Sequence, residues 1–428
     1  MPAKKSPSNF SQHVTPIRLP RILTLEVSLF LFAYLVHFVA ALVLKGEQGS
    51  GLEWAVVADN VLKGKGFVFN FYGTNVPRYA FFPPFYPYFL AASRILSPSH
   101  WVELVQLIQG VFFAFGAVWV RRLAARLMRA DLAWSAGYIV ALWPPLVIYS
   151  IRLTPACFHA AIIPLLLLLL DNAVRRPKVW RTASAGAVFG LLGYSLPSFL
   201  GTLVLLPFGL RRIRVSWARA FSFTGGILIV AMLVLSPWTI RNAIVVRSFV
   251  PVATNIGFNL AGSHNQYASS SYNVLCLGGP TEAQLINLNE LATMNEAGFD
   301  RKLLGQGLSY MVHHPLETVR RDLTRALFFW WTNPNIRLYN FREGVAIVVL
   351  MTVLLPLFLL GLGVSLRSTS ESLQVLIYCV FIWQTLFYMN FAVRGRYSLE
   401  MYPLMIVFGV LGAATIGHRL KGRHEHIN

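Results

Sequence analysis

Long runs of apolar residues constrain most strongly how this chain can fold. A helix of about 20 apolar residues crosses the ~30 Å hydrocarbon layer of a bilayer. Such runs recur along the sequence together with three shorter ones: Leu23–Leu44, Val111–Val120 with its flanks, Leu132–Ser150, Ala218–Pro237, Gly344–Leu366, Leu373–Phe391 and Met401–Gly417, and the shorter Pro155–Leu170, Ala183–Leu196 and Ser198–Leu210. The sequence therefore predicts an all-α polytopic membrane protein with about ten transmembrane helices.

The composition agrees with a chain that has lipid for a solvent. Of its 428 residues, 56% are apolar and 13% are charged, and the mean hydropathy is +0.57. Soluble domains are about 45–50% apolar and about 25% charged. The Pro83–Leu96 segment is apolar but short and rich in proline, so we expect an interfacial or re-entrant helix there.

The basic residues set the predicted orientation. The net charge of +20 comes from 37 Lys and Arg against 17 Asp and Glu. These residues form no soluble basic domain with aromatic stacking positions, which argues against a nucleic-acid partner. They lie at alternate ends of the apolar runs: Lys4, Lys5, Arg18 and Arg21; Arg121, Arg122, Arg126 and Arg129; Arg175, Arg176, Lys178 and Arg181; Arg211, Arg212, Arg214 and Arg219; Arg419, Lys421 and Arg423. The positive-inside rule places these clusters and both termini in the cytoplasm. Leu23–Leu44 is longer than the apolar core of a signal peptide, so we expect an uncleaved anchor.

This topology leaves two long segments on the outer side of the cytoplasmic (inner) membrane. The predicted divisions are a cytoplasmic segment 1–22, a transmembrane region 23–238 with the first outer loop 45–100, a large outer loop 239–342, further spans in 343–418 and a cytoplasmic tail 419–428. The large loop predicts two amphipathic helices, Ala297–Val312 and Leu316–Trp331, separated at His314-Pro315 because proline disfavours a helical residue before it. Loops beyond about 12–15 residues are usually functional or disordered, so we expect the active site to face outside.

Glu53 is the candidate general base. It follows the first span in Gly51–Leu62, which predicts a short amphipathic helix with Glu53 and Asn60 on one face and Asp59 elsewhere. A carboxylate near the membrane boundary is desolvated and can accept a proton from an incoming hydroxyl. The alternative is a surface carboxylate that the dipole of a helix N-terminus favours, and spacing alone favours this alternative.

Four arginines at the predicted outer interface are candidate phosphate ligands: Arg78, Arg241, Arg394 and Arg396. Guanidinium groups stay charged and bind phosphate oxygens bidentately. For any one of them, an equally good interpretation is an arginine that reaches lipid headgroups, or an ion pair of Arg396 with Glu400 four residues later. The positive-inside bias leaves few basic residues at this interface, so the presence of all four favours a shared ligand.

The other polar groups give weaker signals. His37 and His159 lie within spans, where a single His is more often a helix–helix hydrogen-bond partner than a ligand. Neither the three cysteines nor His313 and His314 have partners at metal-ligand spacing. No cofactor is therefore predicted, and a divalent metal stays an option that ligand spacing does not support. The polar, Gly-rich run from Asn255 to Asn265 either contacts a sugar or phosphate or forms a turn, with the turn slightly favoured.

Four short motifs, in this order, resemble the GT-C type glycosyltransferases that use polyprenyl-phosphate sugars, the dolichyl-phosphate-mannose-protein mannosyltransferase-like and aminoarabinose-transferase-like proteins. They are Glu53-Trp54 leading to Gly64-Lys65-Gly66-Phe67; Pro83-Pro84-Phe85-Tyr86-Pro87; Pro237-Trp238-Thr239-Ile240-Arg241-Asn242 leading to Asn255-Ile256-Gly257-Phe258-Asn259-Leu260; and Arg394-Gly395-Arg396-Tyr397 shortly before Pro403. Each motif is short, so the specificity lies in their combination and order, which cover most of the chain.

The resemblance implies that a sugar carried on a polyprenyl phosphate is transferred to a lipid, glycan or protein acceptor outside the cytoplasmic membrane, by hexosyl or pentosyl transfer with inversion. Glu53 would then be the catalytic residue. Arg78, Arg241, Asn242, Arg394, Arg396 and Tyr397 would bind substrate or phosphate. Relatives often have an acidic residue where the fourth span begins, whereas this chain has Leu153-Thr154-Pro155 there. That departure puts a metal-assisted site in doubt.

Two other classes of function remain open. A polytopic transporter or lipid flippase needs ionisable residues inside the spans, and Glu26, His37 and His159 give only thin support for one. A non-catalytic partner in a membrane glycosylation complex is the third hypothesis.

Overall fold

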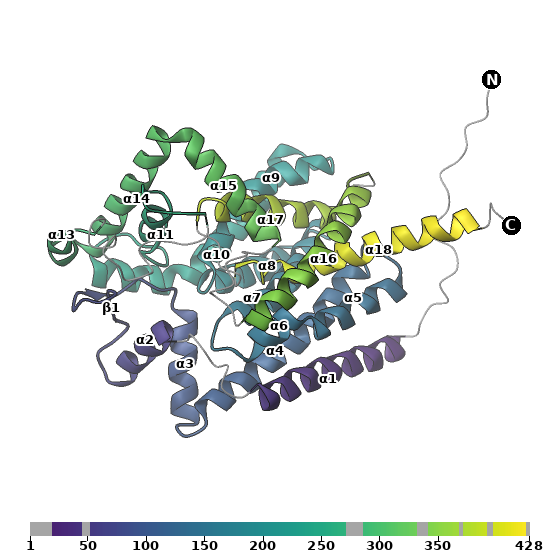
Figure 1. Ribbon diagram of the computed structural model, residues 1–428, viewed down its shortest axis with the longest axis horizontal. Helices are drawn as coiled ribbons and strands as arrows, with labels where there is room; N and C mark the ends of the chain where they lie inside the picture. The colour runs from purple at the N-terminus through teal and green to yellow at the C-terminus, as the bar shows by residue number, and fades with distance from the viewer. Residues whose placement is uncertain are drawn as a thin grey trace.

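The structure, a computed structural model, describes residues 19–44, 52–270, 286–331, 341–367, 371–391 and 397–424. Within these ranges the chain is almost entirely helical, as Figure 1 shows. The strands β1 (Phe69–Asn70) and β2 (Pro77–Arg78) form a short antiparallel pair in which Phe69 lies opposite Arg78.

Five helices of the described ranges are long and apolar enough to cross a membrane. They are α1 (Leu19–Val43), α4 (Trp101–Ala124), α7 (Ala156–Arg175), α10 (Trp217–Val246) and α16 (Phe341–Arg367). A bent pair, α5 (Ala130–Leu142) and α6 (Pro144–Ile151), makes a sixth if it is counted as one broken span. The other predicted spans are the helices α8 (Val179–Gly193), α9 (Thr202–Arg212), α17 (Ser372–Tyr388) and α18 (Tyr402–His424). The predicted all-α polytopic architecture is confirmed.

Proline accounts for the places where the helices differ from the predicted runs. The run Leu132–Ser150 bends by 48° at the junction of α5 and α6, because a proline ring clashes with the preceding helical turn. The run Ser198–Leu210 begins as the 3-10 helix η1 (Pro197–Gly201) before α9. In contrast, α10 continues through Pro237 to Val246, since neighbouring groups in a membrane protein can replace the one hydrogen bond that proline removes.

The shorter predicted helices of the two polar segments are also present. They are α2 (Leu52–Leu62), α3 (Phe85–Leu96), α14 (Glu296–His313) and α15 (Pro315–Trp330), with the predicted break at His314. Two more helices are α11 (Ile256–Ser263) and α13 (Leu288–Thr293). The turn expected between Asn255 and Asn265 is wrong, because α11 occupies most of that run and packs against α14.

The long helices lie side by side, and α2, α3, α11, α13 and α14 gather at one end of them (Figure 1). The start of α1 and the end of α18 lie at the opposite end of the molecule. Large apolar side chains on the outside of the long helices are exposed, among them Leu35 of α1, Leu233 of α10 and Val353 of α16. Such surfaces suit a lipid environment.

Two large apolar cores hold the described parts of the chain together. One fills the space between the membrane helices, where α16 and α18 approach so closely that a Cβ atom on Gly361 would lie 1.8 Å from the Phe408 carbonyl oxygen. Small residues at such contacts are typical of helix packing in membranes. The second core is rich in aromatic rings and joins α2, α3 and the β1–β2 pair to α11 and α14. The candidate site lies where the two cores meet.

Candidate active-site cavity

A cavity of about 520 Å³ lies between these two cores. Its volume falls within the roughly 300–1,000 Å³ typical of small-molecule sites. It is lined by the start of α2, the loops before α3 and α7, the link between α8 and α9, the α11 region, the end of α17 and the turn before α18. Apolar side chains make up most of the wall. Its polar side chains include Glu53, Tyr72, Thr154, His159, Ser195, Asn255, Asn259, Tyr397 and Glu400.

Glu53, the predicted general base, is part of this wall. It lies in the first turn of α2, is half-buried, and its Oε1 atom accepts a hydrogen bond of 3.0 Å from the Tyr72 hydroxyl. Tyr72 belongs to the turn between β1 and β2. The second carboxylate of α2, Asp59, instead pairs with Arg94 of α3. The helix thus presents one carboxylate to the cavity, as the predicted face requires.

A second polar centre contains His159, in the first turn of α7. Its Nδ1 atom lies 3.0 Å from Glu400 Oε1, and its Nε2 atom lies 2.7 Å from the Ser195 hydroxyl oxygen. All three side chains line the cavity. Glu400 is buried in the turn before α18, and burial raises the pKa of this carboxyl while the hydrogen bond from His159 lowers it. The cavity therefore holds two separate groups that can exchange protons.

Sequence reasoning foresaw only part of this second centre. His159 was expected to join helices by hydrogen bonding, and it does connect α7 to the turn before α18 and to Ser195 after α8. Glu400 was considered only as a partner of Arg396. His159 and Glu400 are 241 positions apart, and no local spacing indicates a contact over that distance. The available signal was one ionisable residue within a span, His159, and another directly before a span, Glu400.

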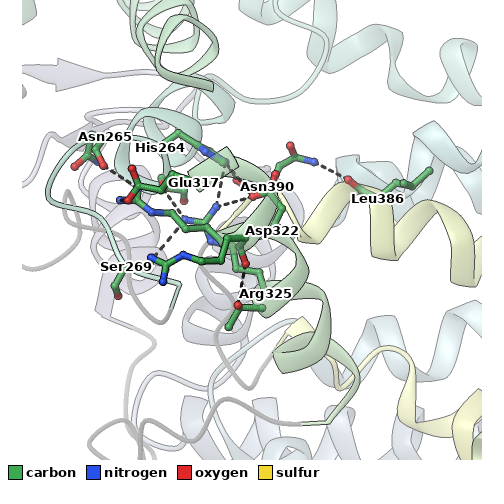
Figure 2. Close-up of polar contacts among 12 residues, drawn as sticks. His264, Asn265, Ser269, Glu317, Asp322, Arg325, Leu386 and Asn390 are labelled. Carbon is green, nitrogen blue, oxygen red and sulfur yellow. Dashed lines mark hydrogen bonds and ion pairs between the residues drawn. The ribbon is translucent and has the colours of Figure 1, made fainter. Parts of the chain in front are cut away.

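A buried charged network braces the cavity from α15. Arg325 is 0% exposed and its guanidinium bonds to Asp322 at 3.0 Å and to the Ser263 carbonyl oxygen at 2.6 Å. His264 Nε2 lies 3.1 Å from Arg325 and 3.0 Å from the Asn390 carbonyl oxygen. Figure 2 shows α15 reaching the ends of α11 and α17 in this way. Burial and the Arg325 charge lower the pKa of His264 to about 4, so its imidazole is neutral at pH 7.

Arg78, a predicted phosphate ligand, lies in the protein interior and does not line the cavity. Its guanidinium donates a 2.7 Å hydrogen bond to the Leu291 carbonyl oxygen and stacks between the rings of Phe71 and Phe299, 5.9 and 5.1 Å from their centroids. These contacts join β2 to α13 and α14. They are contacts that hold a fold together, and a phosphate-binding role for Arg78 stays a prediction.

Arg241 and Asn242 also lie outside the cavity lining. Arg241 donates to the Tyr79 and Phe67 carbonyl oxygens and lies over the Trp238 ring at 4.6 Å. Asn242 is buried, and its amide donates to the Val250 and Val252 carbonyl oxygens at 3.1 and 3.2 Å. Arg241 thus bonds α10 to segments that precede it in the sequence, and Asn242 bonds it to the segment that follows it. Their predicted part in phosphate binding has no direct geometric support.

The last predicted motif is only partly visible. Arg394 and Arg396 lie outside the described residues. Tyr397 lines the cavity, and its ring stacks on Tyr388 with centroids 5.2 Å apart. Phe391, the last described residue before the two arginines, lines the cavity too. Among the described lining residues there is no Lys or Arg.

The described parts of the chain contain no group of three or more His, Cys, Asp or Glu side chains that could hold a metal ion. Leu153-Thr154-Pro155, where relatives often have an acid, leads directly into α7. A divalent metal therefore stays an option that ligand spacing does not support.

Comparisons with known proteins give a match in three dimensions only. No protein-family model and no curated protein matches the sequence. A crystal structure of the Archaeoglobus fulgidus oligosaccharyltransferase complexed with Zn and sulfate matches with a TM-score of 0.54 and 16% identity over 92% of this chain and 50% of that chain. The same enzyme tethered with an acceptor peptide matches with a TM-score of 0.53 and 14% identity, with the same coverage.

A third structure, the archaeal oligosaccharyltransferase AglB from Archaeoglobus fulgidus in complex with an inhibitory peptide and a dolichol-phosphate, matches with a TM-score of 0.54 and 12% identity. It is covered over 52% of its length, by 94% of this chain. The chain thus spans about half the length of the solved structures it matches. At these identities the likeness concerns the fold alone, and the chain is a polytopic membrane protein that shares the fold of about half of these archaeal oligosaccharyltransferase structures.

Proposed function

We propose that the chain is a membrane glycosyltransferase that moves a sugar from a polyprenyl-phosphate donor to a lipid, glycan or protein acceptor. The observation that carries the proposal is the cavity between the two cores, which has Glu53 in its wall. The fold supports it, because the similar archaeal structures include complexes with dolichol-phosphate and with an acceptor peptide. A largely apolar wall also suits a donor that remains anchored in lipid.

Glu53 is the proposed general base. The acceptor oxygen attacks the anomeric carbon while Glu53 takes the proton of the acceptor hydroxyl, and the bond from that carbon to the phosphate oxygen breaks. The carrier leaves with the bonding electrons as polyprenyl phosphate. Attack opposite the leaving phosphate inverts the anomeric configuration. The hydrogen bond from Tyr72 to one Glu53 oxygen orients the carboxylate without using its other oxygen.

The proposed orientation follows from the charge distribution of the sequence. Basic clusters at alternate span ends put both termini in the cytoplasm and the cavity on the outer side of the cytoplasmic membrane. Arg394 and Arg396 remain proposed phosphate ligands. Support comes from their position in the sequence between Phe391 and Tyr397, both of which line the cavity.

The test is Glu53→Gln, which keeps the shape of the side chain and its ability to accept from Tyr72. Transfer should fall by about 10²-fold or more, since general-base catalysis contributes about 10²–10⁴-fold. The measurement is mass spectrometry of envelope lipids, glycans and proteins from a deletion strain complemented with each variant. The wild-type chain restores a hexose or pentose increment, and Glu53→Gln does not.

Glu103→Gln is the matched control. Glu103 is exposed in the first turn of α4 and lies outside the cavity lining, so that variant should complement fully. Complementation by Glu53→Gln as complete as that of the control would remove Glu53 from the mechanism. Substrate flux into liposomes without any sugar transfer would favour the transporter hypothesis instead.

A further inference from the structure

The first turn of α7 faces the cavity with its backbone N–H groups uncapped. The helix begins at Ala156, and Thr154, Pro155 and Ala156 all line the cavity. The first N–H groups of any α-helix lack an intrahelical acceptor, and a Ser, Thr, Asp or Asn side chain usually caps them. Here Pro155 stands at the capping position, and no side chain caps the helix. The positive end of the helix dipole is therefore directed at the cavity.

Thr154 gives a second, independent indication of a ligand at this place. The residue is 1% exposed, and its hydroxyl has no hydrogen-bond partner among the described residues. A buried hydroxyl without a hydrogen-bond partner is unfavourable for the folded protein. Since Thr154 lines the cavity, a molecule that enters the cavity can accept this hydrogen bond.

The chemistry around this turn suits an anion. His159 lies at the end of this first turn, and its Nε2 atom is bonded to the Ser195 hydroxyl, which also lines the cavity. Among the described lining residues there is no Lys or Arg, so within this part of the wall the helix end and these polar groups can stabilise negative charge, in addition to the proposed ligands Arg394 and Arg396. Helix N-termini with a nearby hydroxyl are common phosphate sites, because several N–H groups meet several phosphate oxygens.

We propose that the N-terminus of α7 and the Thr154 hydroxyl bind the phosphate group of a lipid-borne phosphate, with Ser195 and His159 beside it. The identity of the carrier as a polyprenyl phosphate rests on the proposed function. In that reaction negative charge grows on the phosphate as the sugar leaves, and fixed N–H donors stabilise that charge without rearranging.

The experiment compares two lipids of equal chain length, polyprenyl phosphate and polyprenol, bound to the full-length protein in detergent. Trp54 and Trp383 line the cavity, so quenching of tryptophan fluorescence reports on binding. Thr154→Val removes the hydroxyl and keeps the shape of the side chain. It should weaken binding of polyprenyl phosphate by about tenfold to a hundredfold, the range for a hydrogen bond to a charged group, and leave polyprenol binding unchanged.

Thr202→Val is the matched control. Thr202 is buried, its hydroxyl also lacks a partner among the described residues, and it lies outside the cavity lining. This variant should bind both lipids like the wild-type protein. Thr154→Asp is a second variant, whose carboxylate occupies the helix end and repels phosphate, so it should lose at least as much polyprenyl phosphate binding as Thr154→Val.

Three results would overturn the proposal: wild-type binding of polyprenyl phosphate by Thr154→Val, equal loss of both lipids, or unimpaired binding by Thr154→Asp. The test separates the phosphate site from the proposed function. Glu53→Gln should bind polyprenyl phosphate like the wild-type protein even though it does not transfer sugar. If Glu53→Gln transferred sugar fully while Thr154→Val lost only the binding of polyprenyl phosphate, Glu53 would be rejected as the base. The proposed phosphate site would still stand.

Discussion

Two helices, α7 and α11, start at the cavity, and they differ in whether a side chain accepts hydrogen bonds from the N–H groups of the first turn. At the start of α11 the Asp300 carboxylate accepts hydrogen bonds from the N–H groups of Gly257 and Phe258, at 2.9 and 3.2 Å. At the start of α7 a proline stands in the capping position and no side chain caps the helix. Both helices contribute residues to the same wall.

The difference indicates that the N–H groups of a helix N-terminus contribute to stability in α11 and to the proposed function in α7. The Asp300 carboxylate occupies two N–H groups at the start of α11, so fewer are left for a ligand, and it links α11 to α14. A helix end left open contributes less to stability and can bind an anion that enters from outside. Removing or altering the internal partner of a helix end tests this division between stability and function.

Removing the carboxylate from α11 should have the largest effect on stability. Asp300→Ala leaves two buried N–H groups without their acceptor, at roughly 2 kcal/mol each, so we expect a loss of about 4 kcal/mol. Thermal unfolding in detergent measures it. Asp131→Ala is the control, because Asp131 is an exposed acid at the start of α5 whose contact with Arg129 is also exposed. A loss below about 1 kcal/mol is expected there, and equal losses in the two variants would contradict the comparison.

The stability of the α11 cap should also depend on pH. Burial raises the pKa of Asp300 from 3.8 to about 6, the N–H groups of Phe258 and Gly257 and the Arg78 charge lower it, and Glu296 raises it. The folded-state pKa lies above the unfolded one, so the contribution of protonated Asp300 is complete below about pH 3.8 and is lost as the pH rises through 6. A pKa near 6 in place of 3.8 corresponds to about 3 kcal/mol.

Asp300→Asn isolates this dependence, because its amide oxygen can still accept from both N–H groups but does not ionise. Between pH 4 and pH 7 the wild-type protein should lose about 2 kcal/mol of stability relative to the variant, since part of the full difference already lies below pH 4. Unfolding temperatures of both proteins across that range measure the difference. A difference that does not change with pH would show that Asp300 is already ionised at pH 4.

The sequence predicted the helices well because their signals are local. The break at His314-Pro315 and the apolar run that became α16 need only a short window, since proline and apolar periodicity act within a few residues. The bend between α5 and α6 was missed although Pro144 marks it, because the apolar run continues across the bend. The length of α10 was missed for the opposite reason, a proline that the helix tolerates.

The site was predictable only in part, because it depends on contacts between distant segments. Glu53 was identified as a candidate from its place after the first span, and it does line the cavity. Arg78 and Arg241 have the right charge and depth for a phosphate, but whether a guanidinium faces a cavity or a neighbouring carbonyl oxygen is decided by tertiary packing. The pairing of His159 with Glu400 has the same origin. Thr154 was noticed only as part of the segment where the resembled family often has an acidic residue.

The smallest effect is expected at α13, where the side chain of the residue before the helix caps its N-terminus. Asn287 stands before α13, and its side-chain oxygen accepts from the N–H groups of Asn289 and Glu290 at 3.0 and 3.3 Å. Asn287→Ala should cost about 1 kcal/mol of stability, the usual value for a lost cap, and Asn287→Asp should cost almost nothing because a carboxylate caps equally well. Lipid binding should be unchanged in both variants, since Asn287 does not line the cavity. Asn287→Ala could instead weaken binding of polyprenyl phosphate as much as Thr154→Val is expected to do. The loss of a distant helix cap would then impair binding, and the effect of Thr154→Val would no longer indicate a phosphate site at the N-terminus of α7.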